Sequence, residues 1–203
     1  MQHEIDFWKH FVTTNRFLDG WLSSSKTPEL NDIVYGFLLN HRSSSVLDVG
    51  SGVVSLLHGT IDSDKLVACD PLADEYAKFF NYNGHRVNQP IAKSAESLDL
   101  NTKFNIVHIS NALDHCQDVQ KAYSNLYACV DVNGYLILQS FANEGSYENY
   151  EGFHQWNLNT IDNQLILTNK YADTWVLDKD PYFVTKIFIP SLHKEWFIWI
   201  KKK

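Results

Sequence analysis

The sequence predicts an α/β protein with a Rossmann-like, doubly wound and mostly parallel sheet of seven strands that ends in an antiparallel C-terminal hairpin. Short apolar runs alternate with segments of helical spacing over residues 45–141, which is typical of βαβ units in a parallel sheet. The tail differs, because two strand-like runs, 182–189 and 195–200, are separated only by a short segment around Pro190. Such a short separation is typical of a hairpin.

The helices and strands follow from local patterns. A first helix is expected over residues 4–22, where apolar side chains recur at helical spacing. A second helix begins with Thr27 as its cap and Pro28 at its first position, and runs to about Asn40. Further helices are expected near residues 73–80 and 119–130, and the seven strands at 45–49, 65–69, 85–91, 104–109, 135–141, 182–189 and 195–200.

Composition and charge exclude several classes of protein. Of the 203 residues, 44% are hydrophobic and 14% aromatic, which is too apolar for a disordered chain. The chain has 17 Lys and Arg residues and 24 Asp and Glu residues, which gives a formal net charge of −7. Because nucleic-acid and anionic-membrane binding normally require basic surfaces, we expect neither partner.

Cysteine usage and the N-terminus indicate a cytoplasmic protein. Cys69, Cys116 and Cys129 form no CxxC pair, which favours reduced thiols over disulfides or a zinc site. The N-terminal segment lacks the basic and apolar regions of a signal peptide, and the apolar runs are far shorter than a membrane span. Both a monomer and a homodimer remain open.

A glycine turn follows the first predicted strand and points to an adenosine-containing cofactor. Gly50 and Gly52 allow a tight turn, and Asp70 closes the second strand, where an acid can bind ribose hydroxyls. The dinucleotide pattern GxGxxG fails, because residue 55 is Ser. Asp48 would repel a pyrophosphate but suits a ligand with an ammonium and a sulfonium group, such as S-adenosylmethionine (SAM). Alternatively, Asp48 caps a following helix.

The segment 46–52 resembles the first motif of the class I SAM-dependent methyltransferases. Further segments resemble that family's later motifs in the same order, and four strings also resemble a poorly characterised bacterial subgroup. The later motifs are 69–72, 94–98, 104–115 and 130–136, and the four strings are 70–76, 111–115, 143–152 and 153–158. The chain departs from the family at Val54, which replaces a third glycine, at Ser94, where an acid is common, and at Asn105, which is usually Asp.

The resemblance implies one domain over residues 1–203, with a helical cap at 1–40, a SAM-binding core at 45–141 and an acceptor-side extension with the closing hairpin at 142–203. It also assigns a set of residues to the cofactor. These are Asp48, Gly50 and Gly52 at the methionine, Asp70 at the ribose, Pro71 and Leu72 beside the adenine, Ala95 or Glu96 at the adenine edge, and Ser110 and Asn111 at the methyl end.

Methyl transfer from a sulfonium needs a base only to unmask the acceptor atom, and two histidines are candidates. His115 follows the fourth predicted strand, and His154 lies in the extension where acceptor pockets are usually built on this fold. The alternatives are a helix-start histidine and a structural turn. Asp114 and His115 resemble a metal pair, but no third ligand stands at useful spacing, so no metal is predicted.

The expected acceptor is a small molecule or a sugar, methylated at oxygen. The acidic balance, and the absence of the Pro-Pro and Pro-Cys dipeptides of adenine and cytosine methyltransferases, argue against nucleic-acid substrates. The sugar preference rests on the association of similar proteins with surface-glycan enzymes. Two other functions stay open: a non-catalytic SAM-binding protein, and a nicotinamide-dependent oxidoreductase on a related sheet.

Overall fold

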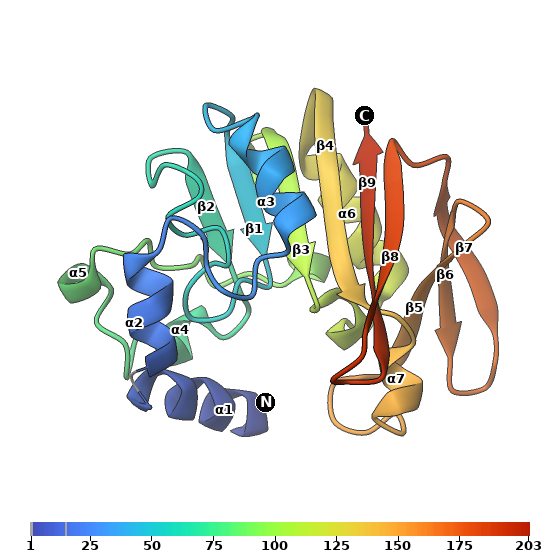
Figure 1. Cartoon of the computed structure of the whole chain (residues 1–203), viewed down its shortest axis with the longest axis horizontal. Helices are drawn as coiled ribbons and strands as arrows, with labels where there is room; N and C mark the ends of the chain where they lie inside the picture. Colours follow the sequence, from blue (N-terminus) through green and yellow to red (C-terminus); the bar gives the residue numbers. More distant parts are fainter. Residues whose placement is uncertain (1, 15) are drawn as a thin grey trace. The chain divides into compact units, whose positions relative to one another are not determined.

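The computed structural model describes residues 2–14 and 16–203, and the side chains of Arg16 and Phe17 lie outside the description. The chain forms two compact units, Met1–Ser94 and Ala95–Lys203, which are described in turn. Figure 1 shows helices and strands in both units, so the predicted α/β class is confirmed. Within the described residues, every helix is too short or too polar to cross a membrane.

The first unit holds a pair of parallel strands, β1 (Val46–Val49) and β2 (Leu66–Cys69), which pair in register from Val46 and Leu66 onward. All four residues of β1 are buried, as expected for a strand covered on both faces. The helices of this unit are α1 (Gln2–Thr13), α2 (Arg16–Ser23), α3 (Asp32–Leu39), α4 (Ala73–Tyr76) and α5 (Tyr82–His85).

An apolar cluster joins the N-terminal helices to the segment after β1. Trp21 of α2 packs in one cluster with Val53 and Val54, and with Tyr76 of α4. The Tyr82 hydroxyl donates a hydrogen bond to the Val53 carbonyl over 3.1 Å. This packing fixes the turn that carries the two motif glycines.

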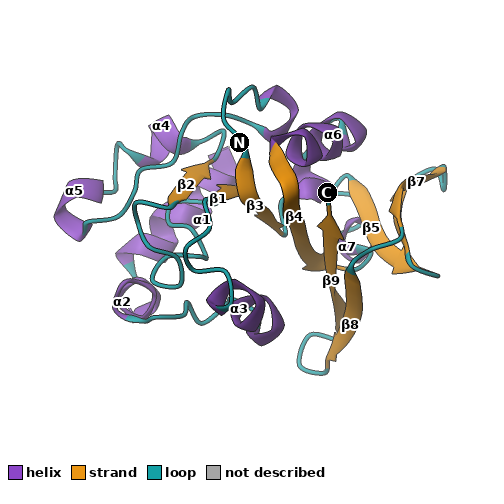
Figure 2. Ribbon diagram, turned by 90° about the horizontal axis from the view of Figure 1, so that it is seen from above, coloured by secondary structure: helices purple, strands orange, loops and turns teal. Residues whose placement is uncertain are grey.

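The second unit contains two sheets. In the larger one, β3 (Phe104–Ser110) and β4 (Val130–Phe141) are parallel, and β9 (Lys194–Lys202) pairs antiparallel with both β4 and β8 (Phe183–Ile189). The smaller sheet is antiparallel and lies to one side of these strands in Figure 2. Its strands are β5 (Trp156–Ile161), β6 (Gln164–Asn169) and β7 (Thr174–Lys179).

The helical elements of the second unit are α6 (Val119–Cys129), α7 (Glu144–Tyr147) and the short 3₁₀ turns η1 (Ala95–Ser97) and η2 (Leu113–His115). Asp118 caps α6, because its side chain accepts a hydrogen bond from the Lys121 main chain. The predicted helix at 119–130 and the predicted closing hairpin are both confirmed.

Among the described residues, the first unit contributes two strands and the larger sheet of the second unit four, six in all and not the predicted seven. The weak strand expected at 85–91 is wrong: Ile91 forms only an isolated bridge with Cys69. Arg86 has a left-handed backbone (φ 55°), and Pro90 lacks an N–H group for a ladder. The Asn88 side chain instead donates to the carbonyls of Ser63 and Leu66.

Two other expectations about local structure are corrected, and one sheet was not expected. The helix predicted over 4–22 is two helices, α1 and α2, and residue 15 between them lies outside the described residues. The second helix begins at Asp32 with Asn31 as its cap, while the Thr27 hydroxyl donates to the Leu56 carbonyl. The small sheet of the second unit was not predicted. The sequence signal for this sheet was the pair Asp162 and Asn163, which is typical of a tight hairpin turn, between two segments in which apolar and polar residues alternate. Both residues have a left-handed backbone.

The packing of α6 generates a first prediction. Leu126 is fully buried in the second unit, so Leu126→Ala should lower the free energy of unfolding by about 2–5 kcal/mol through lost burial and a cavity. Urea unfolding followed by circular dichroism measures the change. Gln120→Ala on the exposed side of the same helix is the control and should change stability by less than about 0.5 kcal/mol. Equal losses in both variants would contradict this packing.

Candidate functional site

The glycine turn of the first unit is held by main-chain hydrogen bonds. The N–H groups of Gly50 and Ser51 donate to the Cys69 carbonyl at 2.8 and 3.2 Å. Gly50 and Gly52 both have a φ of 66°, which other residues rarely adopt. A Cβ on Gly52 would also lie 2.2 Å from the indole ring of Trp8, so this glycine is required by conformation and by space.

Asp48 is buried and bonds within the turn. Its Oδ2 accepts a hydrogen bond from the Ser55 hydroxyl at 2.5 Å, and the Ser55 oxygen accepts one from the Leu57 N–H at 3.0 Å. Residues 50–65 are all described and form turns rather than a helix. The alternative that Asp48 caps a following helix is therefore wrong, and Asp48 stabilises the turns through Ser55.

Asp70 joins the glycine turn to the segment after β2. Its two carboxylate oxygens accept hydrogen bonds from the N–H groups of Gly52 (3.0 Å) and Leu72 (2.9 Å). Burial raises the pKa of Asp70, and the two main-chain bonds and the Tyr76 hydroxyl oppose that rise. A carboxylate has about four acceptor positions, and Gly52, Leu72 and Tyr76 occupy three of them, so capacity remains for a ligand hydroxyl group. Pro71 is exposed and Leu72 is half-buried.

The adenine-edge candidates belong to the second unit, where both take part in local hydrogen bonding. Ala95 is buried in η1, and the carbonyls of Ala95 and Glu96 both accept hydrogen bonds from the Asn125 side chain at 2.9 Å. The Glu96 carboxylate accepts a hydrogen bond from the Gln117 N–H at 2.8 Å. These contacts attach η1 to α6 and to the segment before it.

The methyl-end candidates lie at the carboxyl end of β3. Ser110 is the last residue of that strand, and Asn111 follows it with a left-handed backbone (φ 46°). The Asn111 side-chain oxygen accepts hydrogen bonds from the Ser140 hydroxyl (3.1 Å) and the Phe141 N–H (3.2 Å). Asn111 therefore fastens the end of β3 to the end of β4.

The two histidine candidates meet around Asp114, although they are 39 residues apart in the sequence. The distance from His154 Nδ1 to Asp114 Oδ2 is 2.7 Å, and His115 Nε2 lies 3.2 Å from His154 Nδ1. His115 Nε2 also lies 3.7 Å from Asp114 Oδ2. We call these three residues the Asp-His-His cluster. His154 is the third group that sequence spacing alone did not reveal.

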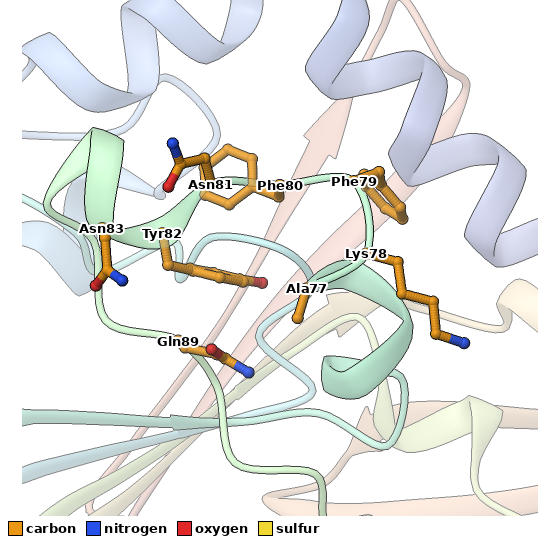
Figure 3. Close-up of a pocket in the computed structure, with 8 residues that line it drawn as sticks. All are labelled: Ala77, Lys78, Phe79, Phe80, Asn81, Tyr82, Asn83 and Gln89. Atoms are coloured by element: carbon orange, nitrogen blue, oxygen red, sulfur yellow. The ribbon is translucent and has the colours of Figure 1, made fainter.

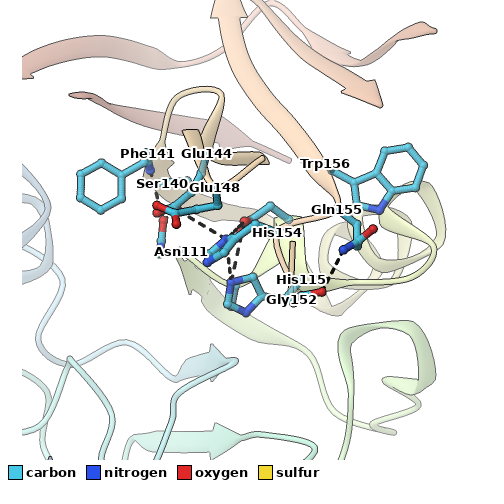
Figure 4. A network of polar contacts seen from close by, with 12 residues as sticks. Asn111, His115, Ser140, Phe141, Glu144, Glu148, Gly152, His154, Gln155 and Trp156 are labelled. Atoms are coloured by element: carbon cyan, nitrogen blue, oxygen red, sulfur yellow. Dashed lines mark hydrogen bonds and ion pairs between the residues drawn. The ribbon is translucent and has the colours of Figure 1, made fainter. Parts of the chain in front are cut away.

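Further charged residues surround this cluster (Figure 4). Glu144 of α7 is buried, and its Oε2 lies 3.9 Å from His154 Nδ1. Lys194 forms ion pairs with Glu144 at 3.5 Å and with the exposed Glu148 at 2.8 Å. The hydrogen bond with Asp114 raises the pKa of His154, and burial, followed by the charge of Asp114, raises the pKa of Glu144.

A surface pocket of about 460 Å³ lies elsewhere in the first unit, lined by residues 77–83 and Gln89 (Figure 3). None of the residues predicted from the sequence lines it. The lining includes the first residues of α5, and the Asn81 side chain caps that helix by accepting a hydrogen bond from the Gly84 N–H. Because this pocket offers no converging catalytic groups, the glycine turn and the Asp-His-His cluster remain the candidates.

The chain belongs to a methyltransferase family. The family described as "Methyltransferase domain" matches residues 25–173, which is most of the chain. The predicted resemblance to class I methyltransferases is thereby confirmed. None of the curated protein sequences compared with the chain matches it.

Solved structures with the same fold are methyltransferases of low sequence identity. The N-methyltransferase NodS from Bradyrhizobium japonicum WM9 is 10% identical with a TM-score of 0.54, covering 84% of this chain and 94% of that one. An S-adenosylmethionine-dependent methyltransferase from Clostridium acetobutylicum ATCC 824 is 10% identical with a TM-score of 0.55, covering 97% and 96%. The 1,6-didemethyltoxoflavin-N1-methyltransferase from Burkholderia thailandensis is 15% identical with a TM-score of 0.50, covering 97% and 87%. These similarities show the Rossmann-like fold of the class.

The contact between Gly52 and Trp8 generates a second prediction. Gly52→Ala should destabilise the protein by about 1–3 kcal/mol, because alanine resists the left-handed backbone and its methyl group meets the indole. In a Trp8→Ala background the penalty should fall, since only the backbone strain remains. Chemical denaturation of the four proteins of this cycle measures both effects.

Gly36→Ala is the matched control for that cycle. Gly36 lies inside α3, and beyond its chain neighbours and the helix's own main chain no described atom lies within 4 Å of the position that an added Cβ would occupy. Alanine should therefore stabilise the protein by about 0.5–1 kcal/mol. A Gly52→Ala variant as stable as Gly36→Ala would contradict the described turn.

Proposed function

We propose that the chain is a SAM-dependent methyltransferase that transfers a methyl group to an oxygen of a small-molecule or sugar acceptor. The observation that carries the proposal is the joined pair of Asp70 and the glycine turn: an acid at the end of β2 bonds to the N–H of Gly52 at 3.0 Å. In open α/β sheets, ligands bind beyond the carboxyl ends of the strands, where this pair lies.

The residues of the first unit fit this cofactor in chemistry. When bound, SAM supplies a methyl group on a positively charged sulfur. Gly50 and Gly52 present main chain without side chains, and Asp48 and Asp70 supply negative charge at the ends of β1 and β2. We assign Asp70 to the ribose hydroxyls, Asp48 and the glycines to the methionine portion, and Pro71 and Leu72 to the adenine.

We propose separately which residues of the second unit contact the cofactor. Ala95 or Glu96 would contact the adenine edge, and Ser110 and Asn111 the methyl end. The location of Ser110 and Asn111 at the carboxyl end of β3 supports their role.

The Asp-His-His cluster supports an oxygen acceptor. A neutral hydroxyl is a poor nucleophile and must lose its proton, whereas many nitrogen acceptors carry a free electron pair. In the transfer, the acceptor oxygen forms a bond to the methyl carbon, the carbon–sulfur bond breaks, and the hydroxyl proton leaves. His115 and His154 are the candidate residues for that step, because both are only partly exposed and converge on one carboxylate.

The structural neighbours support a small acceptor. NodS has been solved in complex with S-adenosyl-l-homocysteine, and the Burkholderia thailandensis enzyme with 1,6-didemethyltoxoflavin and S-adenosylhomocysteine. Both are named as methyltransferases acting at nitrogen, so a nitrogen acceptor is the alternative chemistry.

We further propose that the protein acts in the cytoplasm. The division of the chain into a cap, a SAM-binding core and an acceptor-side extension stays a prediction.

Cofactor binding is the third prediction. Isothermal titration should detect binding of S-adenosylhomocysteine, and Asp70→Asn should weaken it at least about ten-fold, because hydrogen bonds to a charged group contribute about 1.5–3 kcal/mol. Asp74→Asn, an exposed acid in the neighbouring helix α4, is the control and should bind normally. Absence of binding of both SAM and S-adenosylhomocysteine to the wild-type protein would refute the proposal.

The two alternative functions have their own readouts. A non-catalytic SAM-binding protein would bind the cofactor but form no S-adenosylhomocysteine with any pool of small-molecule acceptors. An oxidoreductase would bind NADH instead, and a fluorescence titration with NADH would detect it.

A further inference from the structure

The Asp-His-His cluster has more electron-pair donors than protons to share among them. His154 Nδ1 carries either one hydrogen or one lone pair, yet it lies 2.7 Å from a carboxylate oxygen and 3.2 Å from a second ring nitrogen. If Nδ1 donates to Asp114, it has no lone pair for His115 Nε2. One proton on Nδ1 can therefore serve both neighbours only in a three-centre hydrogen bond.

The buried carboxylate of Asp114 is also incompletely paired. Its side chain is 1% exposed, and within the part of the chain that the structure describes its Oδ1 has no hydrogen-bond partner. The Oε2 of the buried Glu144, 3.9 Å from His154, likewise has no hydrogen-bond partner among the described residues. A charged oxygen buried without a partner is unfavourable, so both oxygens are suited to interact with a cation bound beside them.

The distances suit one metal ion. The three donor atoms are separated by 2.7, 3.2 and 3.7 Å. Donors that each lie about 2.1 Å from one ion are about 3.0 Å apart in octahedral geometry and about 3.4 Å apart in tetrahedral geometry. The observed separations span these values.

The local charge and exposure agree with a cation site that is open on one side. Asp114, Glu144 and Glu148 provide three carboxylates, and Lys194 provides the ammonium group that pairs with the two glutamates. The side chains of His115 and His154 are 26% and 25% exposed, whereas Asp114 is buried. An ion held here from the Asp114 side would keep coordination positions free for another molecule.

We infer that Asp114, His115 and His154 bind one divalent first-row transition-metal ion, with the Glu144 carboxylate adding negative charge beside it. Two imidazoles and one carboxylate suit ions such as Zn²⁺, Mn²⁺, Fe²⁺ or Co²⁺, whereas Mg²⁺ and Ca²⁺ prefer oxygen ligands throughout. Three protein ligands leave room for a second ligand with two oxygen atoms.

The site also narrows the acceptor class, and this part rests on the proposed function. A metal ion lowers the pKa of a hydroxyl group bound to it, which is what an oxygen acceptor requires before methyl transfer. Free neighbouring positions favour an acceptor with two adjacent oxygen donors, such as a vicinal diol of a sugar or a hydroxy acid. On this view the two histidines act as ligands in place of the base role given above, and the hydroxyl proton passes to water on the open side of the site.

Metal titration is the fourth prediction. Protein without an affinity tag, stripped with a chelator, should bind one Co²⁺ per chain with visible absorption bands of nitrogen and oxygen coordination. His115→Ala, His154→Ala and Asp114→Asn should each weaken Co²⁺ binding more than about ten-fold. Even the loss of a residue that only hydrogen-bonds to a metal ligand lowers metal affinity about ten-fold or more. His10→Ala, an exposed histidine in α1, should leave binding unchanged. Circular dichroism verifies that each variant is folded.

Acetohydroxamate, which offers two adjacent oxygen donors, tests the free positions and should shift the bands of bound Co²⁺. No stoichiometric Co²⁺ binding, or equal binding by the wild-type and the three cluster variants, would overturn the metal site. No shift with acetohydroxamate would overturn the acceptor class. Titration of the same metal-free protein with S-adenosylhomocysteine separates the two proposals: cofactor binding without Co²⁺ binding rejects only the metal site, and the reverse rejects only the cofactor assignment.

Discussion

The structure of the first unit depends on the hydrogen bonds that join the ends of β1 and β2. Gly50 and Ser51 donate to the Cys69 carbonyl, and Gly52 donates to the Asp70 carboxylate. These bonds satisfy the main chain of a turn that is followed by no helix in the described residues 50–65. They also compensate the burial of a carboxylate, which would otherwise be strongly unfavourable. The shape of the glycine turn and the burial of Asp70 therefore depend on the same few donors.

In the second unit, Asn111 has a comparable role for the ends of β3 and β4. Its left-handed backbone turns the chain out of β3, and its side chain bonds to Ser140 and Phe141. The chain then enters η2, which carries Asp114 and His115. His154 approaches from the segment before β5, so the cluster is assembled by tertiary structure and not by local sequence.

Local patterns predicted the buried strands, α6 and the closing hairpin, because burial and capping act over a few residues. They failed at 85–91, where Asn88 replaces strand pairing with side-chain hydrogen bonds. At the site, the glycine turn and Asp70 were visible in sequence, since motif spacing reflects their geometry. The junction of His115 with His154 was not visible, because no local signal encodes a contact across 39 residues. Both histidines were nevertheless identified individually as candidates.

The small sheet β5–β7 lies within a segment that leaves the larger sheet after β4 and returns in β8. Both ends of this segment are anchored by β9, which pairs with β4 and with β8. Insertions or deletions between these anchors can therefore change the surroundings of His154 while the hydrogen-bond ladder of the larger sheet stays intact. The architecture allows the surroundings of the cluster to diverge without any change in the scaffold that supports it.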